Sequence, residues 1–243
     1  MQEQALEGRV AIVTGASRGI GRAIALTLAG HGARLSLAAR REPALQAVGA
    51  ELEARGGQAA CFPTDVSREP EVVRLVQDTV ARFGRLDIIV NNAGLGIFGP
   101  LAEMTTEEWD SVMAVNARGP FLLCRETIPY LRQQTHSFIV NIASVVGIKG
   151  YANQAAYSAS KHALMGMSAA LAKEIQPDGI RVHAICPGGV DAPMVRQARP
   201  DLDPSVLMDP QEIADLVLFL VTRQGNAVVD QVHIRRAAST PWT

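Results

Sequence analysis

Short apolar runs alternate with longer segments of helical character along the whole chain. The apolar runs lie at 10–14, 34–39, 58–62, 86–91, 137–143 and 181–186. Their hydrophobicity is nearly continuous rather than alternating, which is typical of parallel strands that are buried on both faces. Helices are expected between them, at 19–31, 43–55, 69–83, 106–132 and 154–176, followed by a helix near 210–222 and a strand near 227–234.

This alternation predicts an α/β fold. Successive βαβ units with right-handed crossovers build a doubly wound sheet with helices on both faces. We therefore expect a three-layer α/β/α Rossmann fold with a mostly parallel, seven-stranded sheet. No linker, low-complexity tract or further internal repeat interrupts the pattern, so residues 1–243 are interpreted as one domain.

Composition and charge argue against several classes of protein. The chain has 48% hydrophobic and 19% charged residues and a net charge of −1, so binding to nucleic acid or to an anionic membrane is not expected. No apolar stretch approaches the roughly 20 residues of a membrane span, and the start MQEQALEGRV is acidic where a signal peptide is basic. We expect a cytoplasmic protein. The three cysteines, Cys61, Cys124 and Cys186, are far apart, so neither a disulfide framework nor a metal site is predicted.

A glycine-rich turn follows the first predicted strand. The segment TGASRGIG places Gly15, Gly19 and Gly21 where that strand passes into a helix. Gly15 is expected to permit the tight turn, and Gly19 and Gly21 to let backbone and helix approach a pyrophosphate at the helix N-terminus. The spacing is GxxxGxG, whereas the usual dinucleotide fingerprint is GxGxxG. A glycine-rich turn without a ligand is therefore the alternative interpretation.

The end of the second predicted strand indicates which dinucleotide would bind. An NAD site usually places an acid there to hold the ribose 2′-hydroxyl, but this strand ends in Ala39, Arg40 and Arg41. Arginine binds a 2′-phosphate through charge-assisted hydrogen bonds, and Arg18 in the glycine turn is a further candidate. NADP(H) is therefore the predicted cofactor. The alternative is that Arg40 and Arg41 are solvated residues that open the next helix.

Candidate chemistry lies between residues 144 and 161. Tyr157 and Lys161 are four residues apart, so on a helix they lie on one face, one turn apart. A free tyrosine has a pKa of about 10, and a nearby ammonium group is expected to lower it toward neutrality. Ser144 follows the fifth strand, at the edge where open α/β sheets bind ligands, and its hydroxyl could hold a substrate oxygen while Tyr157 transfers a proton.

Taken together, the motifs resemble those of the short-chain dehydrogenase/reductase family along essentially the whole chain. The matching motifs are TGASRGIG (14–21), Asp65-Val66, NNAG (91–94), Asn116 in VMAVN, Ser144, YSASK (157–161) and PGGV (187–190). The resemblance implies hydride transfer between NADP(H) and a small-molecule carbonyl or secondary alcohol, with Tyr157 as general acid or base. Its implied catalytic residues are Asn116, Ser144, Tyr157 and Lys161, where Asn116 holds a water linked to Lys161.

The resemblance and the basic residues together define the predicted cofactor site. Its members are Gly15, Ser17, Arg18, Gly19, Ile20, Gly21, Arg40, Arg41, Asp65, Val66, Asn92, Ala93, Gly94, Tyr157, Lys161, Pro187, Gly188 and Val190. The predicted apolar lining of the substrate pocket is Leu95, Ile97, Phe98, Val145, Val146, Tyr151 and Met194. Arg196 and Arg199, in the following lid, are candidates to meet an anionic substrate, although a solvated lid is the preferred interpretation.

Two departures from the family pattern affect this interpretation. Ala192 stands where members commonly have a threonine that bonds the cofactor carboxamide, which implies a loss of about 0.5–1.5 kcal/mol. The tail from Asn226 onward lacks the usual glycine-rich ending, and Trp242 in it is interpreted as a tail or interface residue. The family resemblance implies a homodimer or homotetramer built on the helices at 106–132 and 154–176. Trp109, within the first of these helices, is interpreted as a core residue.

Two other functions remain open at this stage. A catalytically silent NADP-binding redox sensor would not need the intact set of proton-relay residues. A dehydration or epimerisation on the same scaffold usually goes with a longer C-terminal substrate domain. A carbonyl reductase or alcohol dehydrogenase is the leading interpretation.

Overall fold

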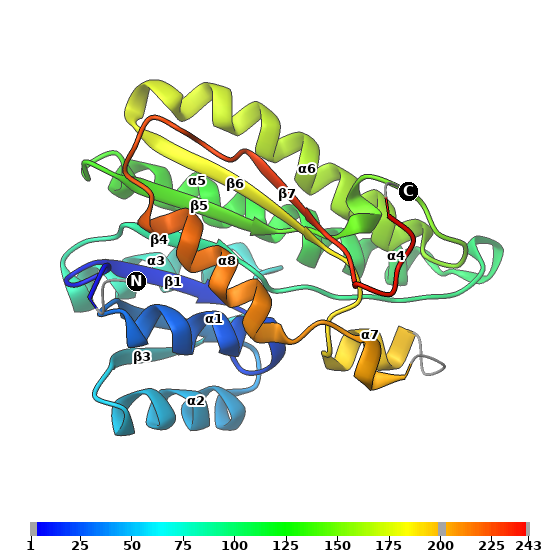
Figure 1. The fold of residues 1–243 in the computed structure, drawn as a ribbon, viewed down its shortest axis with the longest axis horizontal. Helices are drawn as coiled ribbons and strands as arrows, with labels where there is room; N and C mark the ends of the chain where they lie inside the picture. Colours follow the sequence, from blue (N-terminus) through cyan, green and yellow to red (C-terminus); the bar gives the residue numbers. More distant parts are fainter. Residues whose placement is uncertain (1–3, 199–202, 242–243) are drawn as a thin grey trace.

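A single seven-stranded sheet runs through the molecule. The computed structural model describes residues 4–198 and 203–241. The strands are β1 (Val10–Thr14), β2 (Arg34–Ala39), β3 (Gln58–Pro63), β4 (Ile88–Asn91), β5 (Ser137–Ile142), β6 (Ile180–Pro187) and β7 (Gln231–Ile234). Their order in the sheet is β3-β2-β1-β4-β5-β6-β7, and every neighbouring pair is parallel. The predicted Rossmann architecture is confirmed (Figure 1).

Helices cover both faces of this sheet. On one face lie α1 (Gly19–Gly30), α2 (Glu42–Ala54) and α8 (Pro210–Thr222); on the other lie α3 (Glu69–Phe83), α5 (Gly119–Leu131) and α6 (Ala155–Ile175) (Figure 1). Apolar residues at helical spacing explain this packing, since Val72, Leu75, Val76 and Phe83 form one buried stripe on α3. Each face of the sheet therefore has its own hydrophobic core.

The predicted long helix at 106–132 is interrupted. It consists of α4 (Thr106–Met113), a π-helical turn at Ala114–Arg118 and then α5. Pro120 has no amide hydrogen to donate to the carbonyl of Asn116, four residues earlier, so an unbroken α-helical ladder is impossible here. The irregular turn contains Asn116, one of the predicted site residues.

The edge strands differ from the expectation that every strand is buried on both faces. β3 and β7 lie at the two edges of the sheet and are partly exposed. β7 is also shorter than predicted, because pairing with β6 begins only at Gln231. Short helices that lack enough turns to show a period were not predicted: Leu101–Glu103, Val145–Gly147, Gln176–Asp178, α7 (Pro193–Ala198) and Pro204–Val206. Within the described ranges, none of the helices combines the length and the apolarity needed to cross a membrane.

The topology brings the predicted site residues to one edge of the sheet. The carboxyl ends of β1, β4, β5 and β6 lead into the glycine turn, Asn92, Ser144 and Gly188, respectively. The strand order reverses between β1 and β4, and ligands of open α/β sheets bind at the carboxyl ends of the strands beside such a reversal.

Candidate functional site

One large cavity occupies this edge. Its volume is about 1330 Å³, and its lining runs from the β1–α1 turn to the C-terminal tail. Small-molecule pockets usually measure about 300–1,000 Å³, so this cavity has room for a dinucleotide and a second small molecule. All predicted cofactor residues except Gly21 line it.

The glycine turn has the geometry of an anion cradle. Gly15 has φ +65° and Gly19 has φ +54°, in the left-handed region that favours glycine. The first turn of α1 has no side-chain cap and no acidic residue, so its free amides are available to an anion.

Gly21 has a different role from the one predicted. A β-carbon at this position would lie 2.3 Å from the Gly15 carbonyl oxygen and 2.4 Å from Asn92 Nδ2. Asn92 Nδ2 in turn donates to the carbonyl oxygens of Thr14 (2.9 Å) and Gly15 (3.3 Å). Gly21 therefore allows the turn to pack on the β4 loop and does not itself line the cavity.

The end of the cavity near β2 is cationic. Arg18, Arg40 and Arg41 are exposed and line it, and the strand ends in Ala39 without an acid. Asp65 also lines this end and accepts hydrogen bonds from the Ser67 amide (2.9 Å) and hydroxyl (2.7 Å). Burial raises the pKa of Asp65, but the Ser67 hydrogen bonds and the nearby arginine charges outweigh it, so this pKa lies below its usual value.

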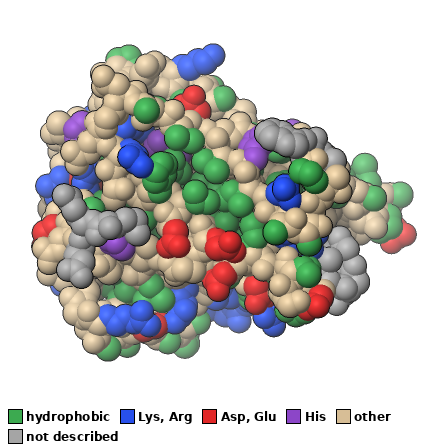
Figure 2. Space-filling view, viewed as in Figure 1, with side chains coloured by type: hydrophobic (Ala, Val, Ile, Leu, Met, Phe, Trp, Pro, Cys, Tyr) green, Lys and Arg blue, Asp and Glu red, His purple; other side chains and the backbone are tan. Residues whose placement is uncertain are grey.

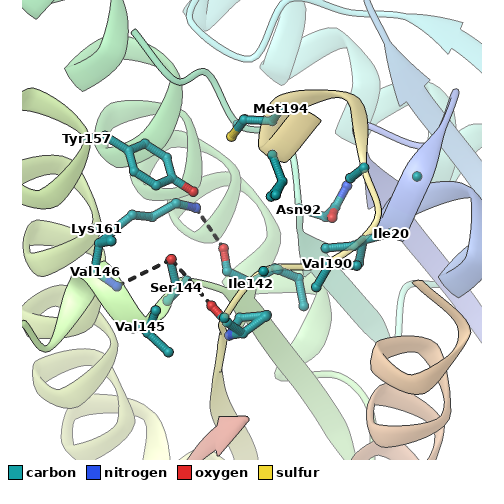
Figure 3. Close-up of a pocket in the computed structure, with 18 of the residues that line it drawn as sticks. Ile20, Asn92, Ile142, Ser144, Val145, Val146, Tyr157, Lys161, Val190 and Met194 are labelled. Carbon is teal, nitrogen blue, oxygen red and sulfur yellow. Dashed lines mark hydrogen bonds between the residues drawn. The ribbon is translucent and has the colours of Figure 1, made fainter. Parts of the chain in front are cut away.

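Ser144, Tyr157 and Lys161 meet on the opposite side of the cavity (Figure 3). Lys161 Nζ donates to the Ile142 carbonyl oxygen at 2.8 Å and lies 5.8 Å from the centre of the Tyr157 ring. Ser144 Oγ accepts from the Val146 amide at 3.3 Å and donates to the Pro187 carbonyl oxygen at 3.4 Å. The spacing predicted from the sequence therefore brings a hydroxyl, a phenol and an ammonium group into one wall.

Burial is the main cause of the pKa shifts of Tyr157 and Lys161. Tyr157 is partly exposed to the cavity, yet burial raises the pKa of its phenol to about 12, although a hydrogen bond with Ser144 opposes the shift. Burial also lowers the pKa of Lys161, which is 4% exposed, to about 8. The lowered pKa predicted for Tyr157 from the sequence is therefore not found in this structure: the pKa is raised, and burial of the phenol is the main cause.

The Asn116 side chain does not reach the cavity. It is fully buried: its Oδ1 accepts from the Leu95 amide at 2.8 Å, and its Nδ2 donates to the Leu95 carbonyl oxygen (2.8 Å) and to Ser160 Oγ (2.9 Å). These bonds tie the π-helical turn to the loop after β4 and to α6, one residue before Lys161. Asn91, the first residue of the NNAG motif, is also buried, and its Nδ2 donates to Asn141 Oδ1 at 2.8 Å.

The predicted substrate wall is largely present. Phe98, Val145, Val146, Tyr151 and Met194 line the cavity. The Phe98 ring packs edge-to-face against Tyr157, with centroids 5.6 Å apart. Leu95 and Ile97 do not line this cavity, and both backbone polar groups of Leu95 are bonded to Asn116.

Of the two arginines predicted in the lid, Arg196 and Arg199, the structure describes Arg196. Arg196 forms a bidentate ion pair with Asp191, with Nε–Oδ1 at 2.7 Å. Arg199 and Trp242 lie outside the described residues.

Trp109 on α4 is 36% exposed, so its interpretation as a core residue is wrong. Its helix starts from the exposed capping residue Thr105 and presents this ring to the surface.

Sequence reasoning missed the contribution of the C-terminal tail to the cavity. Besides Ile234, the tail residues that line it are His233, Arg235, Arg236, Ala238, Ser239, Thr240 and Pro241. A signal was available, because a segment that leaves the last parallel strand must emerge at the carboxyl edge of the sheet. The basic pair Arg235-Arg236 follows that strand directly.

Comparisons with known proteins agree with this architecture. The family model described as short chain dehydrogenase matches residues 9–203. A 3-oxoacyl-(acyl-carrier-protein) reductase from Thermotoga maritima is 34% identical over 235 residues, covering 93% of this chain and 96% of the relative.

Two solved structures are similar over nearly their whole length. A metagenomic short-chain oxidoreductase in complex with NADP is 38% identical with a TM-score of 0.85, covering 96% of this chain and 99% of that one. An alcohol dehydrogenase from the archaeon Thermococcus sibiricus, complexed with 5-hydroxy-NADP, is 30% identical with a TM-score of 0.89, covering 96% and 98%. The chain therefore belongs to the short-chain dehydrogenase/reductase family of oxidoreductases.

Proposed function

We propose that this protein transfers a hydride between NADP(H) and a carbonyl or secondary alcohol, with Tyr157 as the general acid or base. The observation that carries the proposal is the meeting of Ser144, Tyr157 and Lys161 in one cavity whose other end is lined by Arg18, Arg40 and Arg41.

The cavity fits an NADP molecule in three respects. The uncapped N-terminus of α1 and the two left-handed glycines offer backbone amides to a pyrophosphate. Arg18, Arg40 and Arg41 offer positive charge where a ribose 2′-phosphate would lie. A cavity of about 1330 Å³ leaves space for a substrate beside the cofactor. The solved relatives that hold NADP and 5-hydroxy-NADP support the same choice.

The protonation states suit carbonyl reduction. When bound, the reduced nicotinamide supplies the hydride that reaches the carbonyl carbon. With a pKa of about 12, Tyr157 carries its proton at neutral pH and can donate it to the carbonyl oxygen. Ser144 exchanges its long hydrogen bond to the Pro187 carbonyl for one to the same substrate oxygen and so positions it. Lys161, held by the Ile142 carbonyl, stabilises the phenolate that remains.

We propose that Asn116 acts on Lys161 through its backbone carbonyl oxygen and not through its side chain. Both amide hydrogens of its side chain are already bonded to Leu95 and Ser160, so any water linked to Lys161 would be held by the Asn116 carbonyl oxygen instead. The π-helical turn that contains Asn116 is where backbone carbonyls depart from the regular α-helical pattern.

The proposal is tested by a panel of carbonyls and alcohols followed at the nicotinamide absorbance, with NADPH and NADH side by side. Turnover of a carbonyl with NADPH preferred is the expected result. Tight NADPH binding without turnover of any panel member, even at high enzyme concentration, would favour the redox-sensor alternative.

We also propose a homodimer or homotetramer. Trp109 on α4 and Phe121 on α5 are 36% and 45% exposed, and both lie within the segment 106–132 that the family resemblance assigns to subunit contacts. A second apolar area lies between α8 and β7 (Figure 2), where Phe219, Val228 and Val229 are exposed. Two separate surfaces are what a tetramer with two kinds of interface requires. Sedimentation that shows only monomer at micromolar concentration would contradict the proposal.

A further inference from the structure

The C-terminal tail forms a wall of the cavity next to Ser144. Ser144 Oγ lies 3.4 Å from the Pro187 carbonyl oxygen, and Pro187 pairs with Ile234 across the β6–β7 ladder. Arg236 follows two residues after Ile234 and lines the same cavity. A substrate whose carbonyl lies at Ser144 therefore has Arg236 on the neighbouring wall.

This wall is held in a fixed turn. The Arg235 guanidinium donates to the carbonyl oxygens of Arg236 (3.1 Å), Ala237 (3.1 Å) and Ser239 (2.8 Å). The Ser239 amide donates back to the Arg236 carbonyl oxygen at 2.9 Å, and the Gly188 amide donates to the Ile234 carbonyl oxygen at 2.8 Å. Nη1 of Arg235 is thus bonded to the tail itself, and these bonds hold the backbone around Arg236 in place.

The Arg236 side chain is left with a free charge. Its aliphatic part lies over Gly189, where a β-carbon would be only 3.3 Å from Cδ. Throughout residues 4–198 and 203–241, the Arg236 guanidinium has no hydrogen bond or ion pair, whereas Arg196 in the lid is paired with Asp191. Among the described lining residues the only acid is Asp65, which belongs to the opposite end of the cavity.

The two cationic ends differ in a way that points to different anions. Three arginines line the end near β2, which suits a doubly charged phosphate. On the tail, Arg235 is bonded to the backbone through Nη1, whereas the Arg236 guanidinium has no internal partner among the described residues. A single guanidinium fork matches a carboxylate in a bidentate pair. The cavity lining that Arg236 shares with Tyr157 also includes the apolar or aromatic side chains of Val145, Tyr151 and Met194.

We infer that the substrate is an oxo acid, a carbonyl compound with an apolar body and a carboxylate that pairs with Arg236. The inference rests on the proposed function and adds the substrate class to it. Arg236 binds the carboxylate, and Ser144 and Tyr157 act on the carbonyl.

The test compares straight-chain oxo acids of increasing separation between ketone and carboxylate with their methyl esters. We expect the full-length protein with NADPH to have the higher kcat/KM for the acid at the separation that fits. Arg236→Met keeps the packing over Gly189 without the charge, and kcat/KM for that acid should fall roughly 10–100-fold, while kcat/KM for its ester stays the same. Arg236→Lys should restore part of the difference.

A matched control removes the same charge elsewhere. Arg74 is exposed on α3 and does not line the cavity, so Arg74→Met should leave both substrates unaffected. Equal kcat/KM for acid and ester, unchanged in Arg236→Met, would overturn the inference and leave the proposed function intact. A rise in the NADPH dissociation constant of Arg236→Met that accounts for the whole loss would also overturn it, because Arg236 would then bind the cofactor.

A binding measurement separates this inference from the proposed function. Calorimetric titration of hexanoate and methyl hexanoate into the protein with NADP⁺ requires no turnover. Tighter binding of hexanoate that disappears in Arg236→Met supports the carboxylate site even if no carbonyl is reduced. Equal binding of both compounds in the wild type would overturn it.

Discussion

Charged residues are paired differently at the amino ends and at the carboxyl ends of the strands, which are called the amino edge and the carboxyl edge of the sheet here. At the amino edge, Asp87 is 1% exposed and fully satisfied: it accepts from the Val10 amide (2.9 Å) and from Arg85 Nε (2.9 Å) and Nη2 (2.5 Å). At the carboxyl edge, Lys161 is buried and donates to the Ile142 carbonyl oxygen at 2.8 Å, and Arg236 is unpaired among the described residues. Oppositely charged groups that pair with one another stabilise a fold, whereas charged groups without a partner in a cavity are available to bind a ligand.

The largest effect is expected at the carboxyl edge, on turnover rather than stability. Tyr157→Phe keeps the ring but removes the transferable proton, so kcat should fall roughly 10²–10⁴-fold. NADPH affinity and the melting temperature should change little, because phenylalanine keeps the packing of the ring and loses the hydrogen bond of the phenol with Ser144. Lys161→Ala should damage both turnover and cofactor binding. Retention of more than about a tenth of wild-type turnover by Tyr157→Phe, with chemistry rate-limiting, would contradict the proton-transfer role.

The opposite result is expected at the amino edge. Asp87→Ala leaves the buried Val10 amide and part of the Arg85 guanidinium without a partner, which should cost about 2–3 kcal/mol of the free energy of unfolding. Denaturant unfolding measures this loss, and kcat of the remaining folded protein should stay near wild type. A variant as stable as wild type but with lower kcat would show that the two edges are not separate in function.

A smaller change is expected in cofactor preference. Ala39→Asp places a carboxylate at the end of β2, beside the arginines predicted to hold the 2′-phosphate. The NADPH to NADH ratio of kcat/KM should fall roughly 10–100-fold, since like charges repel. Ala39→Asn is the matched control of similar shape without the charge. A wild-type protein that uses NADH at least as well as NADPH would refute this interpretation of the pocket.

The subtlest prediction concerns pH. Lys161 loses its proton as pH rises through about 8, so kcat/KM for reduction should fall above that pH, while Tyr157 stays protonated to about 12. Stability should move the other way. The pKa of Lys161 in the folded state lies below its ordinary value of 10.5, so between about 8 and 10 the unfolded chain binds more protons, and the contribution of Lys161 to stability rises with pH.

Lys161→Met isolates this contribution. Unfolding by denaturant at pH values across that window should show a smaller rise in the variant than in the wild type. Above about 10, the raised pKa of Tyr157 acts in the opposite sense, because the folded state then holds a proton that the unfolded state has lost. An identical pH dependence of stability in both proteins would show that the Lys161 ammonium is not desolvated.

The fold was predictable because β-branched runs and helical segments alternate without interruption, and parallel strands leave few alternative topologies. The failures are local and have physical causes. Pro120 interrupts the long helix, and α7 is too short to show a period. The sign of the Tyr157 pKa shift depends on how deeply the phenol is buried, which a spacing of four residues does not report. The position of Arg236 in the cavity depends on the pairing of β7 with β6, which the sequence pattern does not specify.

The position of the tail has a practical consequence for handling this protein. Pro241 lines the cavity, so an affinity tag joined after residue 243 is separated from this lining residue only by residues 242 and 243. Such a fusion would extend the chain directly from the segment that lines the cavity. Residues 4–8 lead into β1 at the opposite edge of the sheet, as Figure 1 shows. Preparations intended for kinetic work should therefore carry their tag at the N-terminus.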